Sequence, residues 1–132
     1  ASDCRGETAF YPSVNQTVFK TMQIPTTLPT LDELLGRPEY PEEKLIDYYL
    51  SLLKTDKPNI FTMHAEIEGM AKLKWFREFL LALKSNHIIF QRMDEIAQQI
   101  LNSASESPIP ICDFVQGTVD GRSGLLAVQE IV

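Results

Sequence analysis

The sequence predicts an α/β protein in which short buried strands alternate with amphipathic helices. The chain has 132 residues, 44% of them hydrophobic, which is enough for one compact core. Residues 60–63 are apolar and β-forming and follow a Pro58-Asn59 breaker pair, so they predict a short buried strand. Residues 70–85 then repeat apolar side chains at helical spacing. Strands that alternate with helices in this way normally pair in parallel through right-handed crossovers.

The first part of the chain mixes loop and strand signals. Residues 1–6 predict the end of a strand, and residues 7–17 predict a long irregular connection. Residues 18–24 are rich in β-formers and predict a second strand.

Two helices are predicted before the central strand. The run Thr30-Leu31-Asp32-Glu33 is a capping box and predicts a short helix that ends near residue 36. Residues 41–54 carry apolar side chains at helical spacing. Tyr48 and Tyr49 of this second helix are expected to pack in the core, and stacking on a ligand is the alternative.

The longest helix is predicted over residues 70–85. The segment His87-Ile88-Ile89-Phe90 predicts a short strand, in which His87 is expected to be structural or solvated and not a second catalytic base. Residues 94–101 predict a further helix. Beyond a hinge rich in Ser and Pro, residues 108–132 predict an irregular arm with strand-like pieces at residues 111–114, 118–119 and 125–128.

Charge and cysteine content exclude several classes of protein. Twelve basic residues, scattered along the chain, stand against 18 acidic ones, which argues against nucleic acid and against a polybasic membrane patch. No apolar run approaches the ~20 residues that span a bilayer, so we expect a soluble chain. Cys4 and Cys112 lack zinc-site spacing and are expected to be free thiols, with Cys4 as the nucleophile of a thiol hydrolase as the alternative.

The strongest functional signal is the polar loop after the predicted central strand. His64 stands where that strand ends, and Glu66 and Glu68 follow it closely. In α/β folds, ligands and catalytic groups gather at the carboxyl ends of strands. An ionisable histidine beside two carboxylates is therefore a candidate catalytic site. The alternative is a histidine hydrogen-bonded at a strand end, with both carboxylates in water.

Four segments of the chain carry a family resemblance. The run His64-Ala65-Glu66-Ile67-Glu68-Gly69-Met70 resembles the last motif of the arabinose-phospho-undecaprenol deformylases, a branch of the polysaccharide deacetylase (carbohydrate esterase) superfamily. Ala1-Ser2-Asp3-Cys4-Arg5-Gly6 resembles the preceding motif, and Gln23-Ile24-Pro25-Thr26-Thr27-Leu28-Pro29-Thr30 resembles the segment between the two. Gly121-Arg122-Ser123-Gly124-Leu125-Leu126-Ala127-Val128-Gln129 resembles the tail. The four segments lie in the family's order and span nearly the whole chain.

The resemblance implies a distorted, TIM-barrel-like (β/α) barrel of the polysaccharide deacetylase type, of which this chain is the carboxyl-terminal half. Residues 1–132 would form a single partial domain, with β/α units over residues 1–107 and an irregular β-like arm over residues 108–132. The implied partner is the missing amino-terminal half. Open strand edges also favour self-association into a homo-oligomer.

The resemblance also implies metal-assisted hydrolysis of a formamide, with zinc, cobalt or manganese as the divalent metal. In the family the metal is held by an aspartate pair and a His-x-x-x-His motif. The two histidines of this chain, His64 and His87, do not form that motif, so no metal ligand is assigned here and the chain alone is expected to be inactive.

His64 matches the family's general acid, and Asp3 matches the carboxylate that orients that histidine. The alternative for Asp3 is a loop aspartate bonded to its own backbone. Arg5 would bind the substrate phosphate or face solvent. Glu66 and Glu68 would bind sugar hydroxyls or support the metal.

The implied substrate is 4-deoxy-4-formamido-L-arabinose linked through phosphate to undecaprenol. Removal of its formyl group would take place in the cytoplasm, at the inner face of a bacterial inner membrane, as a step of lipid A modification and cationic peptide resistance. The alternative to an enzyme is a non-catalytic interaction module or pseudo-enzyme half-barrel that lacks the metal ligands.

Overall fold

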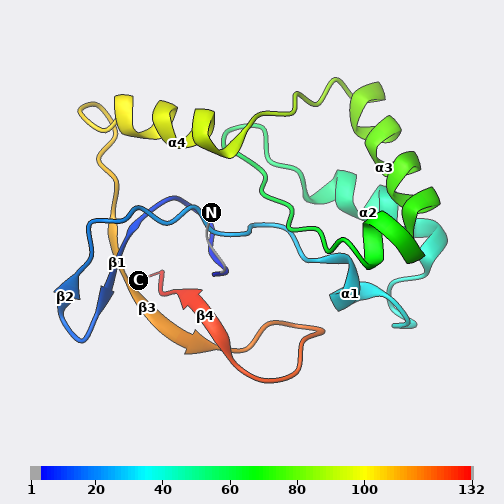
Figure 1. Ribbon diagram of the computed structural model, residues 1–132, viewed down its shortest axis with the longest axis horizontal. Coiled ribbons are helices and arrows are strands. Elements are labelled where there is room, and N and C mark those ends of the chain that lie inside the picture. The colour runs from blue at the N-terminus through cyan, green and yellow to red at the C-terminus, as the bar shows by residue number, and fades with distance from the viewer. Residues whose placement is uncertain (1–3, 132) are drawn as a thin grey trace. The chain divides into compact units, whose positions relative to one another are not determined.

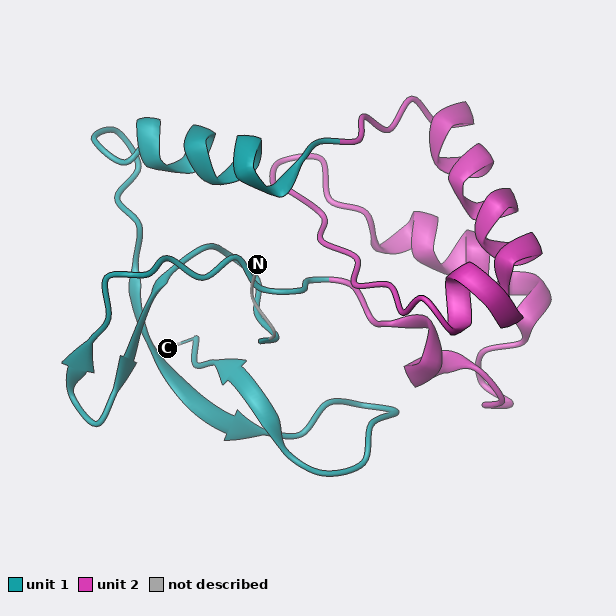
Figure 2. Ribbon diagram, viewed as in Figure 1, with its two compact units in different colours: residues 1–27, 91–132 teal, residues 28–90 magenta. Residues whose placement is uncertain are grey.

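The chain divides into two compact units (Figure 2). The structure is a computed structural model that describes residues 4–131. Unit 1 comprises residues 1–27 and 91–132, and unit 2 comprises residues 28–90. All the strands belong to unit 1 and most of the helices to unit 2, so the described chain is a mixed α/β protein.

Unit 1 is built on a four-stranded sheet in the order β2-β1-β3-β4 (Figure 1). The strands are β1 (Tyr11–Val14), β2 (Thr17–Val18), β3 (Ile111–Gly117) and β4 (Leu126–Gln129). Only β1 and β3 are parallel, whereas β1 with β2 and β3 with β4 are antiparallel pairs. The prediction of parallel pairing therefore holds for one pair of three, because neighbouring strands joined by a direct loop pair in antiparallel fashion.

The strand expected over residues 18–24 is almost absent. Only Val18 lies in a strand, and Gln23 makes one isolated bridge to Phe10. The helix expected over residues 94–101 is confirmed as α4 (Met93–Asn102), which buries Ile96. Near the carboxyl end, the strand-like pieces expected at residues 111–114 and 125–128 are the regular strands β3 and β4, whereas residues 118–119 are not in a strand.

Three of the segments that carry the family resemblance meet in unit 1. Arg5 forms parallel bridges with Thr26 and with Val128. The backbone N–H of Arg5 donates to the carbonyl of Ala127 at 3.0 Å, and the N–H of Gln129 donates to the carbonyl of Arg5 at 2.8 Å. Segments that are far apart in the sequence thus share one network of backbone hydrogen bonds.

Gln129 fixes the turn that follows this network. Its side chain is buried, and Oε1 accepts the backbone N–H of Glu7 at 2.9 Å. A Cβ atom on Gly6 would lie 2.5 Å from Gln129 Oε1 and 2.8 Å from Gln129 Cβ. The backbone can approach Gln129 this closely only because residue 6 has no side chain.

Unit 2 is helical. It contains α1 (Leu31–Leu34), a 3₁₀ turn η1 (Glu42–Lys44) that leads into α2 (Leu45–Leu52), and a π turn η2 (Ile67–Ala71) followed by α3 (Leu73–Ser85). The three helices predicted for this part of the chain are confirmed, each with shorter bounds. The capping box predicted at the start of α1 is present.

An aromatic cluster forms the core of unit 2. Tyr49 is completely buried, and its ring centroid lies 5.2–5.9 Å from the centroids of Phe61, Trp75 and Phe79. The Tyr49 hydroxyl donates to the carbonyl of Pro29 at 3.0 Å. The prediction that the aromatic residues of this helix pack in the core is confirmed for Tyr49.

Two predicted strands of unit 2 are absent from the described chain. Residues 60–63 and 87–90 are not in strands, and His87 adopts a φ of 58°. Ile89 and Phe90 are 83% and 55% exposed, so this apolar run is not a buried strand. A strand needs a neighbour for its backbone hydrogen bonds, and the structure provides residues 60–63 with a bond from Leu28 N–H to the Ile60 carbonyl but with no ladder.

The described residues contain no helix that is both long enough and apolar enough to cross a lipid bilayer. Cys4 and Cys112 are thiols that are not joined in a disulfide, as the sequence predicts.

The close approach of Gly6 to Gln129 gives a test of the fold. Gly6→Ala is expected to lower the free energy of unfolding by about 1–3 kcal/mol, because the new methyl group overlaps Gln129. Gly69→Ala is the matched control, since a Cβ there meets nothing within 4 Å and should change stability by less than about 0.5 kcal/mol. Urea denaturation followed by circular dichroism measures both, and equal stability of the two variants would contradict the packing of Gly6.

Candidate functional site

The segment that carries His64 is anchored in the aromatic core of unit 2. Phe61 lies edge-on to Tyr49 at a centroid distance of 5.4 Å and packs against Phe79 at 5.7 Å. One residue earlier, the carbonyl of Ile60 accepts the backbone N–H of Leu28 at 3.1 Å. The backbone is therefore fixed just before His64 without belonging to a sheet.

His64 itself opens a tight turn. Its carbonyl accepts the backbone N–H groups of Ile67 and Glu68, both at 3.0 Å. The following turn is wider, because Lys72 N–H donates to the carbonyl of Ile67 five residues back, at 2.6 Å. Single π turns of this kind are frequent at functional sites.

The buried side chain of Glu68 stabilises this turn. The residue is completely buried, and its Oε2 accepts the backbone N–H of His64 at 2.7 Å. Its other oxygen, Oε1, is buried and has no hydrogen-bond partner among the described residues. Removing a carboxylate from water is costly, so its bond to the His64 backbone must offset part of that cost. The alternative with both carboxylates in water therefore fails for Glu68, whereas Glu66 is exposed.

The imidazole of His64 faces a carboxylate that sequence reasoning did not identify. Its Nδ1 is buried and has no hydrogen-bond partner among the described residues. The nearest anionic atom is Oδ1 of Asp32, 3.7 Å from Nδ1, with side-chain exposures of 31% for His64 and 40% for Asp32. Asp32 lies in the first turn of α1, where Glu33 Oε2 accepts the N–H of Thr30 at 3.0 Å. Asp32 lies between Thr30 and Glu33, the two residues of the capping box, and that local signal predicts a helix but no contact with His64.

The other residues singled out from the sequence lie elsewhere along the chain. Asp3 lies outside the described residues. Arg5 is partly buried in unit 1, where its backbone joins the bridges described above. His87 is exposed, in line with the expectation that it is structural or solvated. Cys4 is only 1% exposed, which leaves little access for a nucleophile.

No metal centre is visible in residues 4–131. Within that part of the chain, no three or more His, Cys, Asp and Glu side chains are grouped so that they could hold a metal ion. His64, Asp32 and Glu68 are close in the fold but do not form such a group. We therefore assign no metal ligand to these residues.

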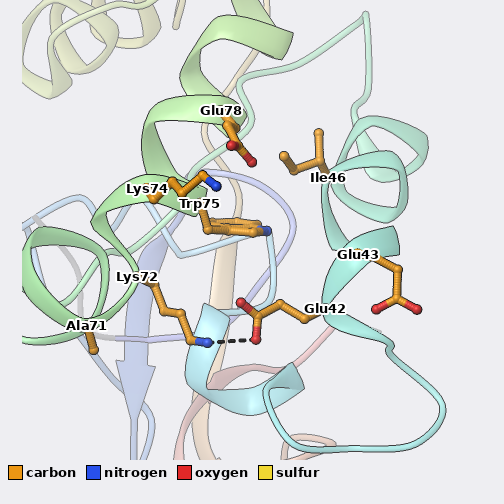
Figure 3. Close-up of a pocket in the computed structure, with 8 residues that line it drawn as sticks. All are labelled: Glu42, Glu43, Ile46, Ala71, Lys72, Lys74, Trp75 and Glu78. Atoms are coloured by element: carbon orange, nitrogen blue, oxygen red, sulfur yellow. Dashed lines mark hydrogen bonds and ion pairs between the residues drawn. The ribbon is translucent and has the colours of Figure 1, made fainter.

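A separate hollow of about 450 Å³ lies in unit 2. It is lined by Glu42, Glu43, Ile46, Ala71, Lys72, Lys74, Trp75 and Glu78 (Figure 3). Acidic and basic side chains are mixed around it, and Lys72 Nζ donates to Glu42 Oε2 at 2.6 Å. His64, Glu66 and Glu68 are not among the lining residues, so this hollow is distinct from the predicted site.

The buried carboxylate gives a test of the His64 turn. Glu68→Ala is expected to lower the free energy of unfolding by about 1–3 kcal/mol, because the partly buried N–H of His64 loses its acceptor. The exposed Glu66→Ala is the matched control and should stay within about 0.5 kcal/mol of the unmodified chain. Trp75 is the one tryptophan of the chain and is buried, so its fluorescence in urea reports unfolding of unit 2. A Glu68→Ala variant as stable as Glu66→Ala would contradict the turn as described.

The chain is similar to known proteins over nearly its whole length. No protein-family model matches the chain. Over 128 residues, 97% of its length, the chain is 34% identical to a protein of Shewanella sediminis (strain HAW-EB3) named "Probable 4-deoxy-4-formamido-L-arabinose-phosphoundecaprenol deformylase ArnD", of which it covers 39%. Over 131 residues, 98% of its length, it is 37% identical to a protein of Wigglesworthia glossinidia brevipalpis with the same name, of which it covers 43%.

The chain spans about two fifths of the length of these curated relatives. The match to each extends over nearly all of the chain and is not confined to the four segments quoted from the sequence. The resemblance of this chain to part of the arabinose-phospho-undecaprenol deformylases is thereby confirmed.

Proposed function

We propose that this chain is part of a deformylase that hydrolyses the formamide group of a lipid-linked amino sugar. The similarity to two proteins with that name supports the reaction class. The observation that carries the proposal is His64, which a buried carboxylate holds on a fixed turn while its side chain keeps 31% of its exposure. A general acid needs both a fixed position and access to the substrate.

The reaction requires an acid because the sugar nitrogen would otherwise leave as an anion. A proton from the acid lets it leave as a neutral amine. Water adds its oxygen to the formyl carbon and gives up a proton to a base from the remainder of the longer protein. The bond between that carbon and the sugar nitrogen breaks, and formate and the free amine are released. In our proposal the imidazolium of His64 gives its proton to the departing nitrogen. His87, the other histidine of the chain, is exposed at the end of α3 and takes no part.

The remaining residues receive supporting roles in this proposal. Glu66, exposed on the same turn as His64, is positioned to bind a sugar hydroxyl. Glu68 is buried and supports the turn, so it does not contact the sugar itself. Arg5 binds the phosphate of the substrate through its guanidinium group. Asp3, to which the resemblance gives the role of orienting His64, lies outside the described residues.

The metal ligands of the proposed enzyme are not found among the described residues of this chain. Residues 4–131 do not offer a ligand cluster that fits a divalent ion. We propose that the ligands for zinc, cobalt or manganese, and the amino-terminal half of a (β/α) barrel, come from the remainder of a longer protein. The relatives support this, because more than half of each lies outside the match. The lipid-linked substrate would place the reaction at the inner face of a bacterial inner membrane, in lipid A modification.

The second candidate function is a non-catalytic module. It is favoured by one observation, the lack of a metal-ligand cluster in the described residues. On that proposal His64 and its turn serve only as structure, and the chain acts by binding a partner.

Activity of the intact protein separates the two candidates. In the full-length protein that carries this chain, His64→Ala is expected to reduce turnover of a formamido sugar by about 10²-fold or more, because the leaving nitrogen loses its acid. His87→Ala is the matched control and should remain within about twofold. Release of formate measures both, and equal turnover of the two variants would remove His64 from the mechanism.

The chain by itself is expected to release no formate. Co-expression with the rest of the full-length protein should restore turnover, and a chelator should abolish it again. Turnover by the purified chain that survives a chelator would contradict both the proposed mechanism and the assignment of His64 as its acid.

A further inference from the structure

We propose that Asp32 is the positioning residue that holds the His64 imidazole with its proton on Nδ1, so that Nε2 is the nitrogen presented to substrate. The pairing of the two side chains rests on geometry within unit 2. Its catalytic consequence rests on the function proposed above.

One ring nitrogen of His64 is buried and the rest of the ring is partly accessible. Nδ1 of His64 has almost no contact with solvent and no hydrogen-bond partner among the described residues. Even so, the side chain keeps 31% of its exposure, so its accessible part lies away from Nδ1. A neutral imidazole carries one N–H, and the partner of one nitrogen decides which of the two is protonated.

Asp32 lies beside the buried ring nitrogen, in the first turn of α1. Its Oδ1 lies 3.7 Å from Nδ1, and a shift of less than about 1 Å would bring the pair to hydrogen-bond distance. Catalytic hydrogen bonds are often this long before a substrate is bound. The helix that carries Asp32 is fixed by Leu31 and Leu34, which are 0% and 3% exposed in the core. The carboxylate is therefore presented by a packed element and not by a loose loop.

The two carboxylates of the His64 turn, Glu66 and Glu68, do not pair with the His64 ring. Glu68 uses Oε2 on the backbone N–H of His64, not on the ring. Glu66 is exposed and makes no ion pair with His64 in the described chain. Two different carboxylates therefore lie next to His64. Glu68, from its own turn, binds the backbone N–H, and Asp32, from α1, lies beside the ring.

The experiment reads the protonated nitrogen directly. Long-range ¹H–¹⁵N spectra of the full chain, recorded about two pH units above the ordinary imidazole pKa of ~6.5, distinguish the Nδ1–H and Nε2–H forms. The chain has two histidines, so the exposed His87 serves as an internal reference. His64 is expected to be mainly in the Nδ1–H form.

Substitution of Asp32 should change that population. Asp32→Asn is expected to move His64 towards the Nε2–H form, because an amide in this place can donate to Nδ1 and favour the other tautomer. Asp32→Glu should keep most of the Nδ1–H form. Asp47→Asn makes the same chemical change in the first turn of α2, on an exposed residue, and should leave His64 unaltered. Amide spectra confirm that each variant is folded.

Two outcomes would overturn the pairing. One is a His64 tautomer population that is the same in Asp32→Asn and Asp47→Asn. The other is a shift produced by Asp3→Asn and not by Asp32→Asn, which would assign the role to Asp3.

Kinetics of the full-length protein test the catalytic consequence. Asp32→Asn should lower kcat by about 10²-fold or more and leave KM within a few-fold, with partial rescue by Asp32→Glu. An unchanged kcat beside a shifted tautomer would overturn the positioning role in catalysis. If the unmodified protein releases no formate while the tautomer shift is observed, the proposed function fails and the Asp32–His64 pair stands.

Discussion

The candidate site of unit 2 depends on one buried side chain, that of Tyr49. Its ring packs edge-on against Phe61, which lies three residues before His64. Its hydroxyl donates to the carbonyl of Pro29, which lies three residues before Asp32. One side chain of α2 therefore fixes the approach of both segments that meet at the imidazole. The fold brings Asp32 and His64 together through the core and without any direct connection along the chain.

The sequence predicts the elements that depend on local signals. The capping box at Thr30 and Glu33 predicts α1, and the apolar repeat predicts α3, because both signals lie within one or two helical turns. Residues 60–63 and 87–90 have the composition of strands, yet a strand also needs a neighbour, which composition does not reveal. The local signals of unit 2 are thus correct for helices and wrong for strands.

The site shows the same division between local and distant information. The motif predicts His64 at the start of a polar loop, although the strand expected before it is absent, and the similarity to the deformylases is confirmed by relatives matched over nearly the whole chain. The contact of Asp32 with His64 joins two positions that no motif links, and the burial of Glu68 depends on how its turn packs. Asp3, which the resemblance places beside His64, lies outside the described residues and stays a prediction.

The order of the two units along the chain has a consequence for folding. Unit 2 is one continuous segment inserted between the two segments of unit 1. Tyr11 of β1 pairs with Ile111 of β3, so this parallel pair cannot form until the whole insertion has been synthesised. Closing so long a loop costs more chain entropy than any contact within the helices of unit 2, which are local in sequence. The pairing of β1 with β3 must wait for the carboxyl-terminal segment, and during synthesis the helical unit that carries His64 can form first.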